Sequence, residues 1–180
     1  MTVTGVSIDP DVLFAAEWTR ADDGVYERTS ARVVIVDSAR RVLLMRALEG
    51  DHSWWFTIGG GIAPGEDDRA AAVREAFEET GIRLDPQDLV GPISRRLPSF
   101  TFLGRPCRQD ERLYLAEVSS GVETTTGGWT DLELATWDGL HWWPLAELLG
   151  TTEVVYPPGL GERISSILDH GWDGTTPKTD

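Results

Sequence analysis

The chain has 180 residues, of which 41% are hydrophobic, and this length and composition suit one globular domain with a sizeable core. Its 30 acidic residues against 16 basic ones give a formal net charge of -14, which excludes strong binding to long nucleic acid, because that binding needs many lysine and arginine contacts. The single cysteine, Cys107, and the absence of an export signal or a membrane-length apolar segment predict a cytoplasmic protein with no membrane partner.

The first 30 residues are expected to form an N-terminal extension with one short helix. Asp9 supplies a capping side chain, Pro10 occupies the first helical position, and "DVLFAAEW" provides an apolar stripe. The runs "SARVVIVD" and "RVLLMRA" then predict two strands joined by a tight turn, because both are rich in β-branched and aliphatic residues. The next run, "SWWFTI", predicts a strand that enters a glycine loop at residues 59–61.

After the glycines the pattern changes to a helical period. Val73, Ala76, Phe77 and Thr80 recur at helical spacing and predict the packed face of a helix. Asp67 or Asp68 is expected to cap its N-terminus, and Gly81 to end it.

Strands dominate the second half of the chain. The segments "LVGPISRRL", "SFTFL" and "ERLYLAEV" predict three strands, with "GRPCRQD" as the turn before the last of them, and "SSGVETTTGGWTD" predicts a loop. The segment "HWWPLAELL" predicts a strand that runs into a helix at Pro144, "GLGERISSILDH" a final amphipathic helix, and residues 171–180 a flexible tail. Together these elements predict an α/β domain over residues 31–170, a mixed sandwich of strands and helices.

Three glutamates, Glu75, Glu78 and Glu79, share one face of the predicted helix, opposite its apolar residues. Three glutamates on a helix are by themselves typical of a solvated face. Hard divalent cations, however, prefer oxygen ligands, so a carboxylate face beside exposed backbone carbonyls also suits a metal ion. The spacing of the neighbouring residues favours the second interpretation.

Gly60 is followed by five residues and Glu66, then by seven residues and the run "REAFEETGI". This is the spacing of the Nudix box, and the chain resembles the Nudix hydrolases over residues 31–170. The resemblance implies a Nudix-type α/β/α sandwich with a mixed β-sheet. Ile58, Ala63 and Ala76 depart from the commonest form of the box, and none of them replaces a metal ligand.

The resemblance also implies a mechanism. Glu75, Glu78 and Glu79 and the carbonyl of Gly59 would bind Mg²⁺, or alternatively Mn²⁺, while Arg74 and Glu66 orient the ligands. A water molecule would then attack phosphorus and cleave the diphosphate linkage of a nucleoside diphosphate derivative. The general base is either a box glutamate or a later glutamate, for which Glu133 is our first choice and Glu111 its competitor.

For the substrate, the resemblance suggests that Arg46 contacts a phosphate, although it is equally typical of a surface arginine. One of the rings of Trp54, Trp55 and Phe56 could stack on a base, with Trp55 as our choice, and strand alternation places at least one of the three in the core. One or two of a set of later arginines could also hold the substrate: Arg95, Arg96, Arg105, Arg108 and Arg112.

Other functions remain open at this point. A Nudix-fold sensor would bind a nucleotide without cleaving it, and an isomerase on the same fold would need an acid–base pair, for which Cys107 is weak support. An RNA 5′-end pyrophosphohydrolase is a further alternative. We expect a small nucleotide-derived substrate and a monomer or homodimer, and the sequence does not select the substrate.

Overall fold

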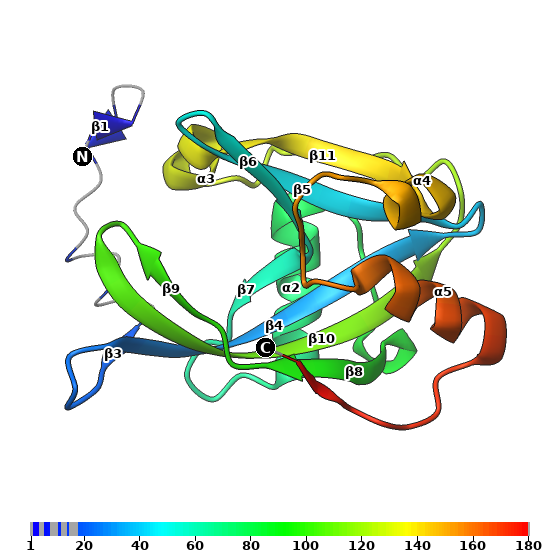
Figure 1. Cartoon of the computed structure of the whole chain (residues 1–180), viewed down its shortest axis with the longest axis horizontal. Helices are drawn as coiled ribbons and strands as arrows, with labels where there is room; N and C mark the ends of the chain where they lie inside the picture. Colours follow the sequence, from blue (N-terminus) through cyan, green and yellow to red (C-terminus); the bar gives the residue numbers. More distant parts are fainter. Residues whose placement is uncertain (1, 4–5, 8–10, 12–13, 15–17, 180) are drawn as a thin grey trace.

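The computed structural model describes residues 2–3, 6–7, 11, 14 and 18–179 (Figure 1). The helix predicted from Asp9 and Pro10 therefore lies outside the described residues, apart from Asp11 and Phe14. Phe14 is buried, and its ring contacts those of Trp18 and Tyr26. No helix in the described part of the chain is long and apolar enough to cross a membrane.

Strands form most of the domain. Those of the first half are β1 (Thr2–Val3), β2 (Val6–Ser7), β3 (Thr19–Arg20), β4 (Tyr26–Asp37), β5 (Arg41–Glu49), β6 (His52–Phe56) and β7 (Ile58–Gly61). Those of the second half are β8 (Val90–Arg96), β9 (Ser99–Phe102), β10 (Arg105–Val118), β11 (Trp137–Pro144), β12 (Val155–Tyr156) and β13 (Lys178–Thr179). The helices are α2 (Asp68–Thr80), α3 (Asp131–Thr136), α4 (Leu145–Gly150) and α5 (Leu160–His170), with a 3-10 turn, η1 (Pro86–Asp88).

The main sheet is mixed, in the order β12-β6-β5-β4-β10-β8-β13, and it confirms the predicted α/β class. β10 runs parallel to β4 and antiparallel to β8, while β11 pairs with β5 and β7 with β4. β4 and β5 pair only near their turn, where Ile35 faces Leu43 and Val36 faces Val42, so the two halves of the sheet diverge beyond it (Figure 1).

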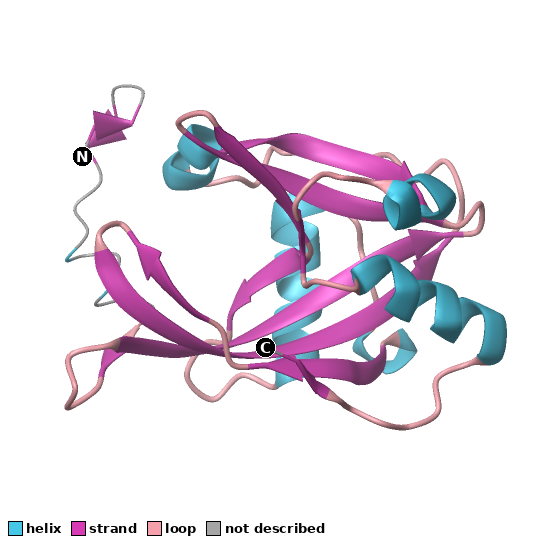
Figure 2. Cartoon of the chain, in the orientation of Figure 1, coloured by secondary structure: helices cyan, strands magenta, loops and turns pink. Residues whose placement is uncertain are grey.

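Two apolar clusters lie on opposite sides of this sheet. Val33 and Ile35 of β4 pack in the cluster that includes the alanines of α2, whereas Val34 and Val36 pack in the cluster that includes α4 and α5. The split follows from the strand period of two, because successive side chains of β4 point to opposite faces. Helices therefore cover both faces of the sheet, as Figure 2 shows, in the predicted α/β/α arrangement.

The glycines that were predicted to form a loop instead form β7, whose partner is β4. Gly59 has a φ of 130°, and a Cβ atom there would lie 2.4 Å from the carbonyl oxygen of Ala31. Because glycine alone permits this approach, the strand continues through a segment whose composition is typical of a loop.

The turn predicted at "GRPCRQD" is also wrong. β10 already begins at Arg105, and the turn consists of Leu103 and Gly104, whose φ values of 47° and 78° suit a tight two-residue hairpin. Cys107 is therefore buried within a strand. The strand was missed because the next two side chains that point inward from β10, those of Gln109 and Glu111, are polar.

The C-terminal segment differs from the predicted tail as well. Lys178–Thr179 pair with β8, and the backbone N–H of Arg95 donates a hydrogen bond to the carbonyl oxygen of Pro177. The hydroxyl of Thr176 donates a hydrogen bond to the carbonyl oxygen of Pro92. These backbone interactions extend the sheet by a strand that the polar composition of the segment did not indicate.

Candidate active site

The predicted box helix is present as α2. Asp67 is its N-cap and accepts hydrogen bonds from the backbone N–H groups of Arg69 and Ala70. Gly81, with a φ of 75°, ends the helix by donating to the carbonyl of Phe77. The capping glycine and aspartate thus fix the length of the helix that carries the glutamates.

The packed face of α2 agrees with the prediction at Ala76 and Thr80 and differs from it at Phe77. Ala71, Ala72, Ala76, Thr80 and Glu79 are the buried side chains. Phe77 is 42% exposed, and the guanidinium of Arg83 lies 4.1 Å from its ring centroid. The small alanines allow α2 to approach the sheet closely. In this orientation of the helix, one glutamate also faces the sheet.

That glutamate is Glu79, which is 3% exposed. Its Oε2 accepts a 2.7 Å hydrogen bond from the backbone N–H of Gly59 in β7. Burial, together with the charge of Glu75, raises the pKa of Glu79 to about 8. Burial likewise raises the pKa of Glu75, whose carboxylate lies directly over the backbone of Gly60, where a Cβ would be 2.6 Å away.

Arg74 forms hydrogen bonds with three acidic side chains of the site. Its Nη1 donates to Glu75 at 2.8 Å and to Glu78 at 3.0 Å, and its Nε donates to Glu66 at 2.8 Å. The bonds from Arg74 lower the pKa of Glu66. Glu66 also accepts from the backbone N–H of Ala63, so the side chain at position 63 takes no part in this contact.

The loop before α3 packs on the end of α2, a contact that the sequence did not indicate. Nε1 of Trp129 donates a 2.8 Å hydrogen bond to the carbonyl of Glu79. A Cβ at Gly128 would lie 2.2 Å from the carbonyl oxygen of Glu78. The only sequence signal was the glycine pair before a tryptophan, which is typical of many loops.

Glu133, our first choice for the general base, lies in the first turn of α3. It forms a capping box with Thr130, whose backbone N–H donates to Glu133 at 2.6 Å. Glu133 lines the same cavity as the box carboxylates, and its charge contributes to the raised pKa of Glu79.

Glu111, the competing base, is 5% exposed in β10. Its Oε2 accepts from Nε of Arg32 at 2.7 Å and from Nε2 of Gln109 at 3.1 Å, and its Oε1 accepts from Arg96 at 3.4 Å. This carboxylate is therefore held between two guanidinium groups.

A cavity of about 2600 Å³ joins these groups. It is lined by the box residues, by Glu133 and Glu111, and by the β9–β10 hairpin. This volume exceeds the roughly 300–1,000 Å³ that is usual for small-ligand sites. The cavity therefore has room for a ligand larger than one nucleotide.

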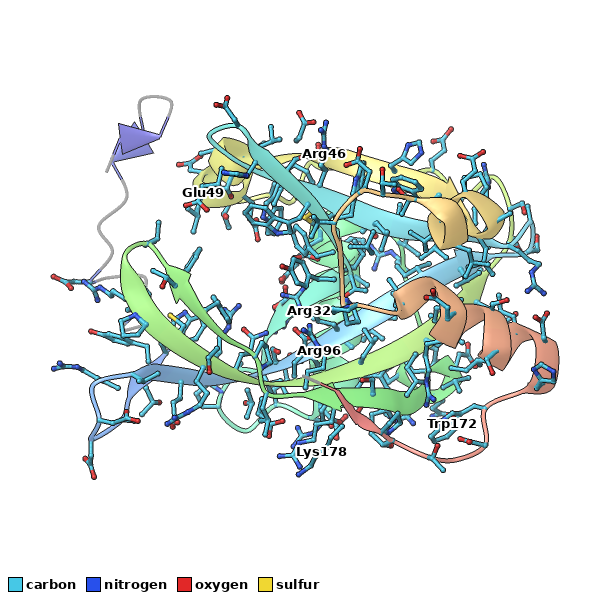
Figure 3. All side chains as sticks on the ribbon, in the orientation of Figure 1. Arg32, Arg46, Glu49, Arg96, Trp172 and Lys178 are labelled. Carbon is cyan, nitrogen blue, oxygen red and sulfur yellow. The ribbon has the colours of Figure 1, made fainter. Side chains whose placement is uncertain are left out.

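Arg46 and Trp55 lie apart from this cavity. The lining includes their neighbours Trp54 and Phe56, because side chains alternate along β6. Arg46 pairs with Asp138 at 2.9 Å on the divergent upper half of the sheet, away from Arg32 and Arg96 (Figure 3). The Trp55 ring packs edge-on against Trp143, with ring centroids 5.2 Å apart.

Within the residues that the structure describes, no three His, Cys, Asp or Glu side chains converge as a metal-binding group. Arg74 lies among Glu66, Glu75 and Glu78 and holds them instead. The donor set nevertheless suits a hard cation, because it consists of carboxylate oxygens. Burial raises the pKa of both Glu75 and Glu79, and a bound cation would stabilise their ionised forms, so the residues fit a divalent ion.

The comparisons agree with this geometry. The family model described as "NUDIX domain" matches residues 26–159, so the chain belongs to the NUDIX domain family. Nudix hydrolases generally use a divalent metal. A relative from Teredinibacter turnerae named RNA pyrophosphohydrolase is 26% identical over 148 residues, which are 77% of this chain and 85% of the relative. A relative of the same name from Escherichia coli is 27% identical over 158 residues, covering 82% of this chain and 87% of the relative.

Solved structures show the same fold. A Caenorhabditis elegans Ap4A hydrolase complex superposes with a TM-score of 0.55 at 20% identity, covering 79% of this chain and 98% of that one. A MutT NUDIX hydrolase from Burkholderia pseudomallei gives a TM-score of 0.53 at 22% identity, covering 77% and 98%. At these identities the likeness concerns the fold.

Proposed function

We propose that the protein is a pyrophosphohydrolase that cleaves the diphosphate linkage of a nucleoside diphosphate derivative by attack of water at phosphorus, with Mg²⁺ as its metal and Mn²⁺ as a substitute. The observation that carries the proposal is the position of Glu79, which is buried beside Glu75 and anchored to Gly59 at the wall of a large cavity. A buried carboxylate pair with raised pKa values is typical of a functional site.

Glu75, Glu78, Glu79 and the carbonyl of Gly59 would hold the divalent ion, which supplies Lewis acidity and a lowered pKa for water. Arg74 keeps the flanking carboxylates oriented through its bonds to Glu66, Glu75 and Glu78. The Gly59 N–H fixes one oxygen of Glu79.

Glu133 is our proposed general base. It lines the cavity, and its charge acts on Glu79. Glu111 lines the cavity too, but both of its carboxylate oxygens are engaged, one by Arg96 and the other by Arg32 and Gln109. We therefore assign Glu111 to holding the arginines rather than to proton transfer.

Of the three rings predicted as candidates for stacking, this proposal selects the two beside Trp55, and it assigns no phosphate contact to Arg46. Trp54 and Phe56 present their rings to the cavity and are the candidates for stacking on a base. We propose a small nucleotide-derived substrate and a cytoplasmic monomer or homodimer. The isomerase alternative loses its support, because Cys107 is buried in a cluster with Phe14 and Trp18.

A second candidate function is hydrolysis at the 5′ end of triphosphorylated RNA. It is favoured by the relatives named RNA pyrophosphohydrolase, which match more than three quarters of this chain. The chain's net charge of -14 argues against extended RNA contacts but not against binding of one terminal phosphate chain.

The test is an assay of nucleotides and triphosphorylated RNA with product identification by ³¹P NMR in ¹⁸O-labelled water. We expect metal-dependent release of phosphate-containing products with ¹⁸O on phosphorus. Tight nucleotide binding with no turnover under any divalent metal would favour the sensor instead.

A further inference from the structure

The segment before α3 packs against the last turn of α2 and is joined to it by two hydrogen bonds. The backbone N–H of Thr125 donates to the carbonyl oxygen of Thr80 at 2.9 Å. Nε1 of Trp129 donates to the carbonyl oxygen of Glu79 at 2.8 Å. The last carbonyls of a helix have no partner within that helix, so this segment supplies donors for the end of α2.

α3 starts directly after this segment and carries Glu133, the proposed base. It has six residues, all of them in the described part of the chain, and none of their side chains is buried. Helices of fewer than about 12 residues are marginal in water, so α3 has little stability of its own. The position of α3 at one end of the layer formed by β5, β6 and β11 (Figure 1) therefore depends mainly on contacts at the two ends of the helix.

Trp129 acts on both ends of α3. At the N-terminus it directly precedes Thr130, the N-cap residue. At the C-terminus its ring packs edge-on against the ring of Trp137, with centroids 5.2 Å apart. Trp137 is the C-cap residue, and its backbone N–H donates to the carbonyl of Glu133. One indole thus joins both ends of the short helix to the helix that carries the box glutamates.

The capping box fixes the side chain of Glu133 within α3. Oε2 of Glu133 accepts hydrogen bonds from the backbone N–H of Thr130 at 2.6 Å and from its hydroxyl at 2.9 Å. Both bonds go to the same oxygen, so under the proposed function Oε1 is the oxygen that accepts a proton. Because Thr130 holds this carboxylate, any shift of Thr130 also moves the base.

We infer that Trp129 is a positioning residue for the general base, because it joins α3 to α2 and so sets the place of the Glu133 carboxylate relative to Glu75, Glu78 and Glu79. The inference rests on the proposed function, in which Glu133 accepts a proton from the attacking water. A base must lie within hydrogen-bond reach of that water, and a displacement of about 1 Å can cost about 100-fold in rate. The indole N–H therefore contributes to the chemical step although it touches no reacting atom.

Trp129→Phe tests this role, because phenylalanine keeps an aromatic ring beside Trp137 and removes the N–H that reaches α2. With a nucleotide substrate in saturating Mg²⁺, we expect kcat to fall about tenfold and KM to change less than about twofold, as for a defect in the chemical step. Wild-type kcat for this variant would overturn the inference.

Trp172→Phe is the matched control. Nε1 of Trp172 also donates to a backbone carbonyl, that of Thr175, at 2.9 Å, but Trp172 does not line the cavity. The substitution therefore deletes the same kind of hydrogen bond outside the site, and kcat should equal that of the wild-type protein. An equal fall in kcat for both variants would mean a general effect on the fold and would overturn the inference.

A double-mutant cycle shows whether Trp129 acts through Glu133. Glu133→Gln removes the base, while glutamine keeps an oxygen that accepts from Thr130. In this background Trp129→Phe should lower kcat by less than about twofold, because a base that is absent cannot be displaced. A tenfold loss in both backgrounds would assign Trp129 to the fold or to the box carboxylates and would overturn the inference.

Hydrogen–deuterium exchange of the metal-free protein measures the position of α3 without turnover. Trp129→Phe should raise the exchange rate of the amides of residues 134–137 by about threefold or more, because the helix loses its bond to α2. Trp172→Phe should leave these amides unchanged. Wild-type exchange of α3 in Trp129→Phe would show that the indole does not hold the helix, and would overturn the inference.

The wild-type protein separates this inference from the proposed function. If it turned over neither nucleotides nor triphosphorylated RNA with any divalent metal, the proposed function would be refuted, and the inference with it. If it were active and Glu133→Gln kept the wild-type kcat, the base would be another group. The inference would then fail, while hydrolysis at the box helix would stand.

Discussion

The backbone N–H of Gly59 lies 2.7 Å from Oε2 of Glu79, and this hydrogen bond joins the strand β7 to the helix α2. Gly59 permits the bond because it lacks a side chain on the face that approaches β4. The same contact holds a buried carboxylate at the wall of the cavity. Backbone geometry and the chemistry of the site therefore depend on one residue pair.

Gly59→Ala should destabilise the protein by about 2 kcal/mol or more, because the added Cβ meets the carbonyl of Ala31 and the φ of 130° is unfavourable for alanine. Urea unfolding measures the change. Gly150→Ala is the control, since no atom lies within 4 Å of its added Cβ, and it should change stability by less than about 0.5 kcal/mol. Equal effects of the two substitutions would contradict the close approach.

Glu133→Gln should lower kcat by about 100-fold with little change in KM, because a general base acts mainly in the transition state. Glu111→Gln should instead raise KM and lower stability, because it leaves Arg32 and Arg96 without their shared carboxylate. Steady-state kinetics and thermal unfolding of both variants provide the comparison. The reverse ranking in kcat would transfer the role of base to Glu111.

Trp54→Ala should raise KM, since its ring faces the cavity, and should leave stability nearly unchanged. Trp55→Ala should do the opposite and destabilise the protein by about 2 kcal/mol, because the ring packs against Trp143 and His141. A KM effect at Trp55 alone would show that the alternation along β6 has been misassigned.

The sequence predicted the elements whose signals are local. α2 combines a helical period, a capping aspartate and a terminal glycine, and its bounds agree with the prediction. The positions of the side chains at the site were harder to predict, because they depend on pairing between strands that are distant in the sequence. Arg28 and Gln109 meet only through the parallel register of β4 and β10, and no spacing in the sequence reports that register.

Two other errors have physical causes. The helical spacing placed Phe77 on the packed face with Val73, Ala76 and Thr80, whereas the close approach of α2 to the sheet selects its alanines and leaves Phe77 exposed. Of the three rings named for the site, Trp54 and Phe56 line the cavity and Trp55 does not, because a shift of one residue reverses the face of a strand.

At acid pH, the free energy of unfolding should depend on the ionisation of Asp37. Burial favours a higher pKa for Asp37, but the bonds from the Arg41 side chain and backbone outweigh it and lower the pKa. A lowered folded-state pKa gives stability above the unfolded value of about 4, and this stability is lost as the pH falls through the folded value. The difference in unfolding free energy between wild-type protein and Asp37→Asn should narrow below about pH 4. If the difference in unfolding free energy stayed constant from pH 7 to pH 2, the ion pair between Asp37 and Arg41 would not stabilise the fold.

The most direct test of the site is the kcat of the Glu79→Gln variant, measured with a nucleotide substrate in saturating Mg²⁺. The control variant is Glu117→Gln, which changes an exposed glutamate of β10. Glutamine keeps an oxygen that accepts from Gly59, so the fold should survive, as circular dichroism will verify. We predict a loss of about 100-fold or more for Glu79→Gln, in the range for loss of a key electrostatic group, and wild-type rates for Glu117→Gln. Equal kcat values for Glu79→Gln and the wild-type protein would contradict the assignment of the box helix as the site of hydrolysis.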